Sequence, residues 1–267
     1  MREERLDLSR PIAWSSEVER RAAIKFFNAA FRAEESGLKQ AHELGDAVSG
    51  WDPELGDVLR LYGNEEGWHR QLLTEFLEFI GGGVEPMGRV TQKLYRLYGR
   101  ATRMESIVLT NLMFETIGST TYRMALRRVR HGPARQMLAI LTRDESFHVP
   151  LNVHFLRNVL ARASSFERLR LNVLYNLLFV TLVALPLASR PKARAFDRIS
   201  AGELSRAYAR YLAELFVTER DLGLRLAPPL LWLFGLKREA LAREASVVSV
   251  EAAERAAERE HVEVTAL

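Results

Sequence analysis

The stretch Glu145-Ser146-Phe147-His148 decides the fold, because it repeats the pattern of an earlier stretch, Glu66-Gly67-Trp68-His69. Each stretch places a carboxylate and an imidazole three residues apart, which on an α-helix puts both side chains on one face. Four-helix bundles build two-metal carboxylate sites from two such pairs and one further glutamate from each of two other helices. The repeat therefore predicts two further glutamates at core positions of two other helices.

Two such glutamates precede the two pairs in the required order. Glu34 falls on the apolar seam of a helix expected over residues 16–48, although the adjacent Glu35 is only one step off that seam, so both stay open as the ligand. Glu115 lies in an apolar stretch of a helix expected within residues 89–130. An ionised glutamate at a core position is costly unless it is paired or coordinates a metal. The sequence therefore predicts six metal ligands from four helices: Glu34, Glu66, His69, Glu115, Glu145 and His148.

Glycine and proline between long 3.6-residue patterns predict an all-α protein. The second helix should begin at Asp52-Pro53 and stop at Gly81-Gly82-Gly83. The fourth should start near Pro133 and be kinked or broken at Pro150, which lacks an amide hydrogen. Further helices are expected over residues 166–188, 202–226 and 237–260. We predict a single domain with the bundle at 17–160, covering helices at 161–236, and a charged C-terminal helix and tail at 237–267.

The composition limits the kinds of metal site that the protein can form, and the N-terminal sequence indicates its cellular location. None of the 267 residues is cysteine, which excludes disulfides, thiolate catalysis and iron–sulfur clusters. Oxygen and imidazole ligands favour iron or manganese. The net charge of +4 is well below that of a protein that coats nucleic acid, so a nucleic-acid partner is not favoured, but the charge allows an acidic partner. Residues 1–16 lack an apolar signal core, which predicts a cytoplasmic protein, and the apolar run 171–188 is expected to be a buried helix, not a membrane span.

The two boxes, Asn64 to His69 and Arg143 to His148, resemble the (D/E)-E-x-x-H boxes of the ferritin-like di-iron carboxylate superfamily over about residues 20–155. Ligand order and spacing are similar to those of aldehyde-deformylating oxygenases, including Tyr122 seven residues after Glu115. The resemblance implies a ferritin-like four-helix bundle with additional C-terminal helices. It also implies two Fe ions, with Fe/Mn or Mn/Mn pairs as alternatives, that activate O2 with an electron donor. Tyr122 would contact a ligand or substrate.

Several neighbouring residues are assigned supporting roles. Glu65 and Asp144 each precede a ligand glutamate and are expected to hold the histidine of the other pair. Glu219 is either a seventh carboxylate near the site or the partner of a local arginine. An apolar substrate chamber is expected from Phe27, Phe31, Tyr62, Phe114, Leu141 and Phe147.

Three functions are compatible with these patterns. The first is an oxygenase or hydroxylase that acts on an apolar small molecule or on a substrate bound to a carrier protein. The second is an iron-oxidising, iron-binding protein without an organic substrate, and the third is a binding or structural protein with a relic site. The chain length argues against a ferritin cage, and a homodimer stays open. Basic residues near the end of the third helix and on the fourth form either a docking face, for an acidic carrier protein or as a lesser alternative RNA, or a solvated surface. They are Arg127, Arg128, Arg130, His131, Arg135, Arg157, Arg162, Arg168 and Arg170.

Overall fold

A computed structural model describes residues 5–86, 92, 103–189 and 194–236. Within these residues the chain is helical and contains no strand, which confirms the predicted all-α class. The long helices are α1 (Glu17–Val48), α2 (Pro53–Phe79), α4 (Met104–Leu126), α5 (Gly132–Ala161), α6 (Ser165–Ser189) and α8 (Ala201–Thr218). The short ones are α7 (Arg194–Asp197), the 3-10 helix η1 (Arg220–Leu222) and α9 (Pro228–Leu233). The predicted C-terminal helix and the first part of the predicted third helix lie outside the described residues.

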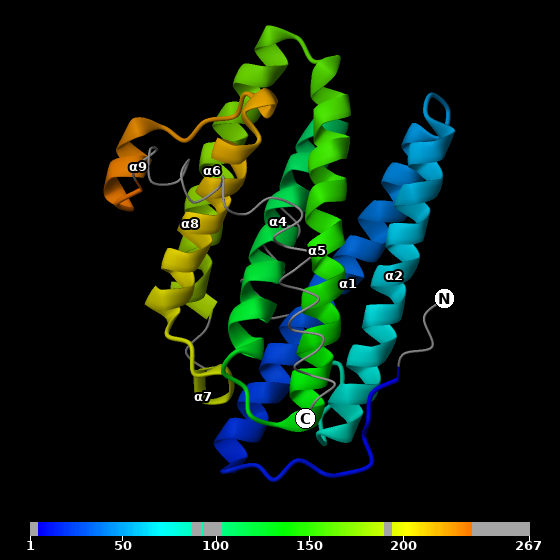
Figure 1. The fold of residues 1–267 in the computed structure, drawn as a ribbon, viewed down its shortest axis with the longest axis vertical. Helices are drawn as coiled ribbons and strands as arrows, with labels where there is room; N and C mark the ends of the chain where they lie inside the picture. Colours follow the sequence, from blue (N-terminus) through cyan, green and yellow to red (C-terminus); the bar gives the residue numbers. More distant parts are fainter. Residues whose placement is uncertain (1–4, 87–91, 93–102, 190–193, 237–267) are drawn as a thin grey trace.

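Two helical hairpins form the part of the fold that carries the predicted ligands. α1 packs along α2, and α4 packs along α5. The hairpins meet with α1 beside α4 and α2 beside α5, so all four helices share one interior. α6 and α8 pack against each other and against the outer side of α4 (Figure 1). The carboxylates of α1, α2, α4 and α5 can therefore meet in one place.

The helix ends follow the predicted local signals. Ser16 caps α1 by accepting a hydrogen bond from the amide of Glu19, and Asp52 caps α2 by accepting one from Leu55. Pro53 occupies the first turn of α2, where its missing amide hydrogen costs nothing. α2 ends at Phe79, just before Gly81, whose φ of 74° lies in the left-handed region. These ends set the register of both ligand-bearing helices of the first hairpin.

Two predicted helix ends differ from the structure. α5 runs through Pro150, so the predicted break there is wrong. A proline removes a single amide donor, the one for the carbonyl four residues earlier, and the rest of the helix keeps its hydrogen bonds. The helix expected over residues 202–226 ends at Thr218 instead. A 3-10 turn follows, and Gly223, with φ 69°, then redirects the chain.

The apolar helix α6 is only partly buried, contrary to the prediction of a buried helix. One side packs on α4 and α8, whereas the exposed side carries apolar residues spaced seven apart, Phe166, Val173, Val180 and Leu187. Among the described helices it is the one long and apolar enough to cross a membrane by length and composition, and 39% of its apolar window is buried. A soluble protein's core helix passes the same test, so this finding by itself carries little weight.

Candidate metal centre

The six predicted ligands converge in the interior shared by the two hairpins. Every one of them is at most 8% exposed, and they come from α1, α2, α4 and α5 as predicted. Glu34 points inward, whereas Glu35 points outward and forms an ion pair of 2.6 Å with Arg32. Helix geometry thus separates two adjacent glutamates, and the inward one is Glu34.

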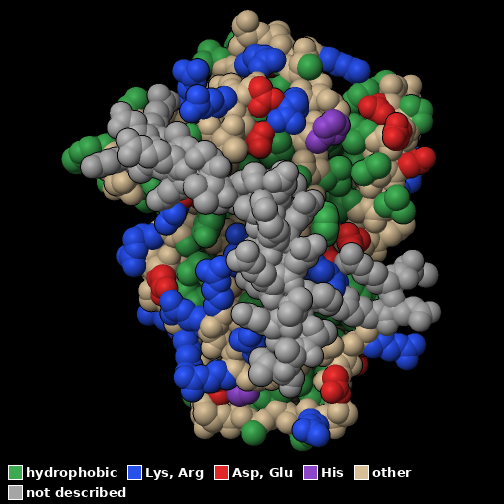
Figure 2. All heavy atoms as spheres, in the orientation of Figure 1, with side chains coloured by type: hydrophobic (Ala, Val, Ile, Leu, Met, Phe, Trp, Pro, Cys, Tyr) green, Lys and Arg blue, Asp and Glu red, His purple; other side chains and the backbone are tan. Residues whose placement is uncertain are grey.

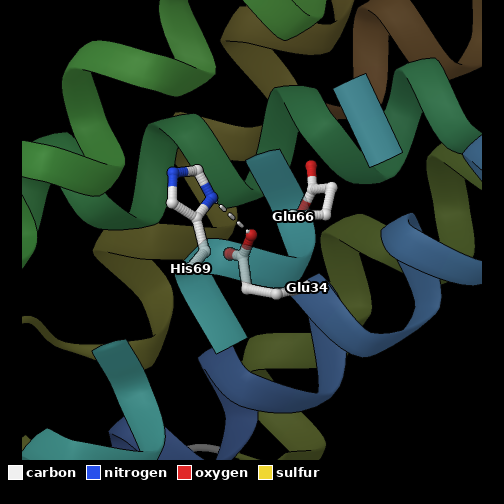
Figure 3. Close-up of side chains that lie close together, drawn as sticks. All are labelled: Glu34, Glu66 and His69. Carbon is white, nitrogen blue, oxygen red and sulfur yellow. Dashed lines mark hydrogen bonds and ion pairs between the residues drawn. The ribbon is translucent and has the colours of Figure 1, made fainter. Parts of the chain in front are cut away.

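Two overlapping groups of side chains have a geometry that can hold metal ions. One group is Glu34, Glu66 and His69, and the other is Glu66, Glu115 and His148. In each group, one ligand atom from every residue lies within 4.8 Å of the others. Figure 3 shows the first group, in which the His69 ring faces the Glu34 carboxylate with Glu66 beside it. Because Glu66 belongs to both groups, its carboxylate is placed to bridge two ions.

Short distances tie the second group to the remaining glutamate. Nδ1 of His148 lies 3.2 Å from Oε1 of Glu66 and 3.4 Å from Oε2 of Glu145. An oxygen of Glu115 lies 3.8 Å from the same nitrogen. In the first group, Nδ1 of His69 lies 3.1 Å from Oε2 of Glu34. In both groups the Nδ1 side of the imidazole therefore faces the carboxylates.

The opposite nitrogen of each histidine contacts an acidic residue from the other hairpin. Nε2 of His69 lies 3.1 Å from Oδ2 of Asp144, and Nε2 of His148 lies 3.2 Å from Oε2 of Glu65. Asp144 also accepts a hydrogen bond of 2.8 Å from Arg143. A carboxylate that accepts the Nε2 proton leaves Nδ1 free to bind a metal. These are the crossed contacts expected for the acidic residue before each ligand glutamate.

Two tyrosines hold the glutamates that come from α1 and α4. Tyr122 donates a hydrogen bond of 2.7 Å to Oε1 of Glu34, and Tyr62 donates one of 2.6 Å to Oε1 of Glu115. The sequence assigned Tyr122 to the site but placed Tyr62 only in a chamber wall. The signal for Tyr62 was its position four residues before Glu66, on the same face of the same helix. Each tyrosine thus belongs to one hairpin and steadies a carboxylate of the other.

Protonation in the cluster is strongly shifted by burial and by neighbouring charge. Burial, with the charge of Glu34 adding to it, raises the pKa of Glu145 to about 8. Burial and the neighbouring carboxylates also raise the pKa of Glu66 and of Glu115. Burial opposes the charged form of His69, but hydrogen bonds to Asp144 and Glu34 outweigh it and raise its pKa to about 10. Without bound cations, a folded protein can bury this many carboxyl groups together only if some of them stay protonated.

Unsatisfied polar atoms show that the cluster fits metal ions. Oε1 of Glu66, Oε2 of Glu145 and Nδ1 of His148 are buried without a hydrogen-bond partner. Buried polar atoms in proteins almost always have a hydrogen-bond partner or bind an ion. Three unpartnered atoms within one cluster therefore indicate a binding site. All three are predicted ligand atoms, and the donor set of carboxylate and imidazole suits iron or manganese. The residues present therefore fit a metal pair.

A cavity of about 580 Å³ leads from the surface to the carboxylates. Its inner wall includes Glu34, Glu66, Glu115 and Glu145, and its outer end is lined by exposed residues of α1 such as Lys39. Of the residues predicted to line a chamber, only Phe114 does so. Four others lie in the interior away from this cavity, and Phe147 is 55% exposed, so that part of the prediction is wrong. No residue of α6 lines the cavity either.

The seventh carboxylate, Glu219, lies outside the cluster. It accepts a hydrogen bond of 2.7 Å from Arg157 of α5, beside a second ion pair between Arg157 and Asp221. The expected local arginine, Arg220 or Arg225, is therefore wrong, because the partner of Glu219 is Arg157, 62 residues away in the sequence. Comparisons with protein-family models, with curated proteins and with solved structures find no match to this chain.

Proposed function

We propose that this protein is a non-heme di-iron oxygenase or hydroxylase, built on a ferritin-like four-helix bundle, that oxidises an apolar or carrier-bound organic substrate. The observation that carries the proposal is the pair of overlapping Glu/Glu/His groups that share Glu66 at the inner end of a cavity open to the surface. A purely structural ion cluster has no use for such a cavity. A metal pair that must meet O2 and a substrate requires one.

The roles of the protein residues follow from their contacts. When bound, two irons would supply the electrons and the binding site needed to activate O2. Glu34 and Glu115 would be the end ligands, each held by a tyrosine hydroxyl, and Glu66 would bridge. Asp144 and Glu65 would keep the two imidazoles in the tautomer that presents Nδ1 to the ligand glutamates.

The first test is anaerobic loading with Fe(II), followed by exposure to O2 under optical spectroscopy. We expect about two irons per chain and a transient absorption band after O2 is added. O2 consumption should rise when an apolar substrate and a reductant are supplied. A protein that takes up no stoichiometric iron, or that consumes no more O2 than free iron does, would refute the proposal.

The second candidate is an iron-oxidising and iron-binding protein without an organic substrate. The same ligand cluster supports it, since bridging carboxylates and histidines also suit the oxidation of Fe(II) itself. Size-exclusion chromatography separates the two, because a large cage of many subunits would favour iron handling. Catalytic O2 consumption that depends on an organic substrate would favour the oxygenase.

The proposed partners are O2, an electron donor and a substrate that is either free or bound to a carrier protein, in the cytoplasm. The exposed apolar side of α6 would suit a homodimer. Basic side chains gather over α8 in Figure 2. However, two arginines of the predicted docking face are already engaged, because Arg128 pairs with Glu203 and Arg135 donates to the carbonyls of Leu126 and Val129. This weakens the case for a carrier at that face.

A further inference from the structure

We propose that the cavity binds a carboxylate with a hydrophobic body, and that Arg70 holds its carboxylate group near the cavity mouth. This inference deepens the proposed function, on which it rests for the oxidation of that ligand. It names the substrate class for the same cavity.

Arg70 lines the cavity and is poorly paired. Its Nε is buried and has no hydrogen-bond partner, and its guanidinium makes no hydrogen bond to any residue that the structure describes. Among the described residues it forms an ion pair with Glu35, at 3.8 Å, which is too long for a hydrogen bond. A guanidinium offers five N–H donors in a planar fork that matches a carboxylate. Arg70 therefore presents unused N–H donors to the cavity.

The neighbours of Arg70 hold its guanidinium in place. Arg32 and Arg70 both lie over the ring of Phe31, each with its guanidinium carbon 5.2 Å from the ring centroid. Arg32 uses both terminal nitrogens, because it donates to Glu35 at 2.6 Å and to the carbonyl of Glu85 at 2.7 Å, and only its Nε has no partner. A fixed, stacked guanidinium loses little conformational entropy when it binds an anion.

The charge around the cavity mouth favours a single negative charge. Three cationic side chains, Arg32, Lys39 and Arg70, line it together with two acidic ones, Glu35 and Glu43. Lys39 lies 3.7 Å from Glu43, and Glu35 is shared between the two arginines. Apart from the four glutamates at the inner end of the cavity, three positive and two negative side chains leave one positive charge at the mouth, which a monoanionic carboxylate would neutralise.

The remaining wall accounts for the hydrophobic body. Ala33, Leu38 and Phe114 line the cavity between its mouth and the glutamates, and Gly37 and Gly118 add no side chain. A volume of about 580 Å³ lies within the usual range for small-molecule pockets. A ligand anchored at Arg70 would therefore extend its apolar part toward the candidate metal centre.

The test measures binding of decanoate and 1-decanol to the full-length protein by calorimetry, before and after anaerobic loading with Fe(II). We expect decanoate to bind about tenfold or more tightly than decanol, which is the effect of a charge-assisted hydrogen bond. Arg70→Gln should abolish this preference. Arg21→Gln, which removes the same charge from an exposed position on α1, should leave it unchanged. Equal binding of the two ligands by the wild-type protein would overturn the proposal, as would a preference that survives in Arg70→Gln.

A second variant moves affinity in the opposite direction. Glu35→Gln removes the carboxylate that competes for both arginines, so decanoate should bind several-fold more tightly. Weaker binding by this variant would contradict the assignment, and tighter binding of decyl phosphate than of decanoate would exclude a carboxylate as the preferred group. Binding before iron is added depends only on the cavity. A protein that prefers decanoate but takes up no iron would refute the oxygenase and retain this inference.

Discussion

The α1–α2 hairpin supplies Glu34 and the pair Glu66 and His69, and the α4–α5 hairpin supplies Glu115 and the pair Glu145 and His148. The two histidines are held to different degrees. Both ring nitrogens of His69 have a carboxylate oxygen at 3.1 Å, and its outer partner, Asp144, is fully buried and braced by Arg143.

His148 is held less tightly than His69. Its Nδ1 has no hydrogen-bond partner, and its outer partner, Glu65, has a side chain that is 34% exposed. Solvent weakens an exposed charge pair, whereas burial strengthens one. The same motif therefore lies in two different environments in the two hairpins. The His69 half is pre-organised, and the His148 half has ligand atoms that still require a partner.

The largest expected effect comes from the residue that both halves share. Glu66→Ala removes the carboxylate common to the two groups, so both ion positions should fail together. We expect iron content after anaerobic loading to fall from about two per chain to well below one. Glu78→Ala, an exposed position on the same helix, is the control and should retain full loading. Retention of two irons by Glu66→Ala would mean that the halves do not share a ligand.

The next effect separates the two halves through the acidic partners of the histidines. Loss of such a partner usually lowers metal affinity about 10- to 100-fold. The loss of metal affinity in Asp144→Asn should be near 100-fold, because the carboxylate of Asp144 is fully buried. The loss in Glu65→Gln should be near 10-fold, because the side chain of Glu65 is partly exposed. Competition with a chelator measures both affinities. Equal losses, or a larger loss in Glu65→Gln, would refute the proposed difference between the halves.

The third prediction concerns pH. Glu145, with its pKa raised to about 8, and His69, with its pKa raised to about 10, keep protons at pH 7 that cations must displace. Metal loading should therefore release protons and tighten about tenfold per pH unit for each proton released. Calorimetry in two buffers of different ionisation enthalpy counts these protons. Metal binding that is independent of pH between 6 and 8 would contradict the protonation described.

The same groups give the metal-free protein a pH-dependent stability of defined sign. Both bind protons more tightly in the folded than in the unfolded chain, so the folded state holds more protons across this range. The free energy of unfolding should therefore fall as pH rises from 7 to 9. Metal should reverse the trend, because the cations then offset the carboxylate charges. Thermal unfolding curves with and without metal test both statements.

The smallest effect comes from the glycines three residues after Glu34 and Glu115. A Cβ on Gly37 would lie 3.0 Å from Cδ of Glu66, whereas one on Gly118 would meet only Tyr122, at 4.0 Å. Gly37→Ala should therefore shift the bridging carboxylate and lower metal affinity roughly threefold. Gly118→Ala should leave affinity unchanged and stabilise the helix by about 0.5–1 kcal/mol. Weaker metal binding by Gly118→Ala than by Gly37→Ala would show that there is less free space beside Gly118 than beside Gly37.

Much of the candidate site could be predicted from the sequence, because helix periodicity is local. Spacing alone put Glu66 above His69 and Glu145 above His148 on their helix faces, and Ser16 and Asp52 marked the helix starts. The assignment of metal ions to this cluster stays a prediction.

Tertiary structure decided which of these groups meet and what surrounds them. The packing of the hairpins decides between Glu34 and Glu35, which the seam left one step apart, and it alone brings Arg157 to Glu219 and leaves Phe147 exposed. It also opens the cavity beside Arg70. The physical reason is that a helix fixes the direction of each side chain relative to its own axis. Which neighbour that side chain reaches depends on how distant helices pack, and no local pattern encodes that.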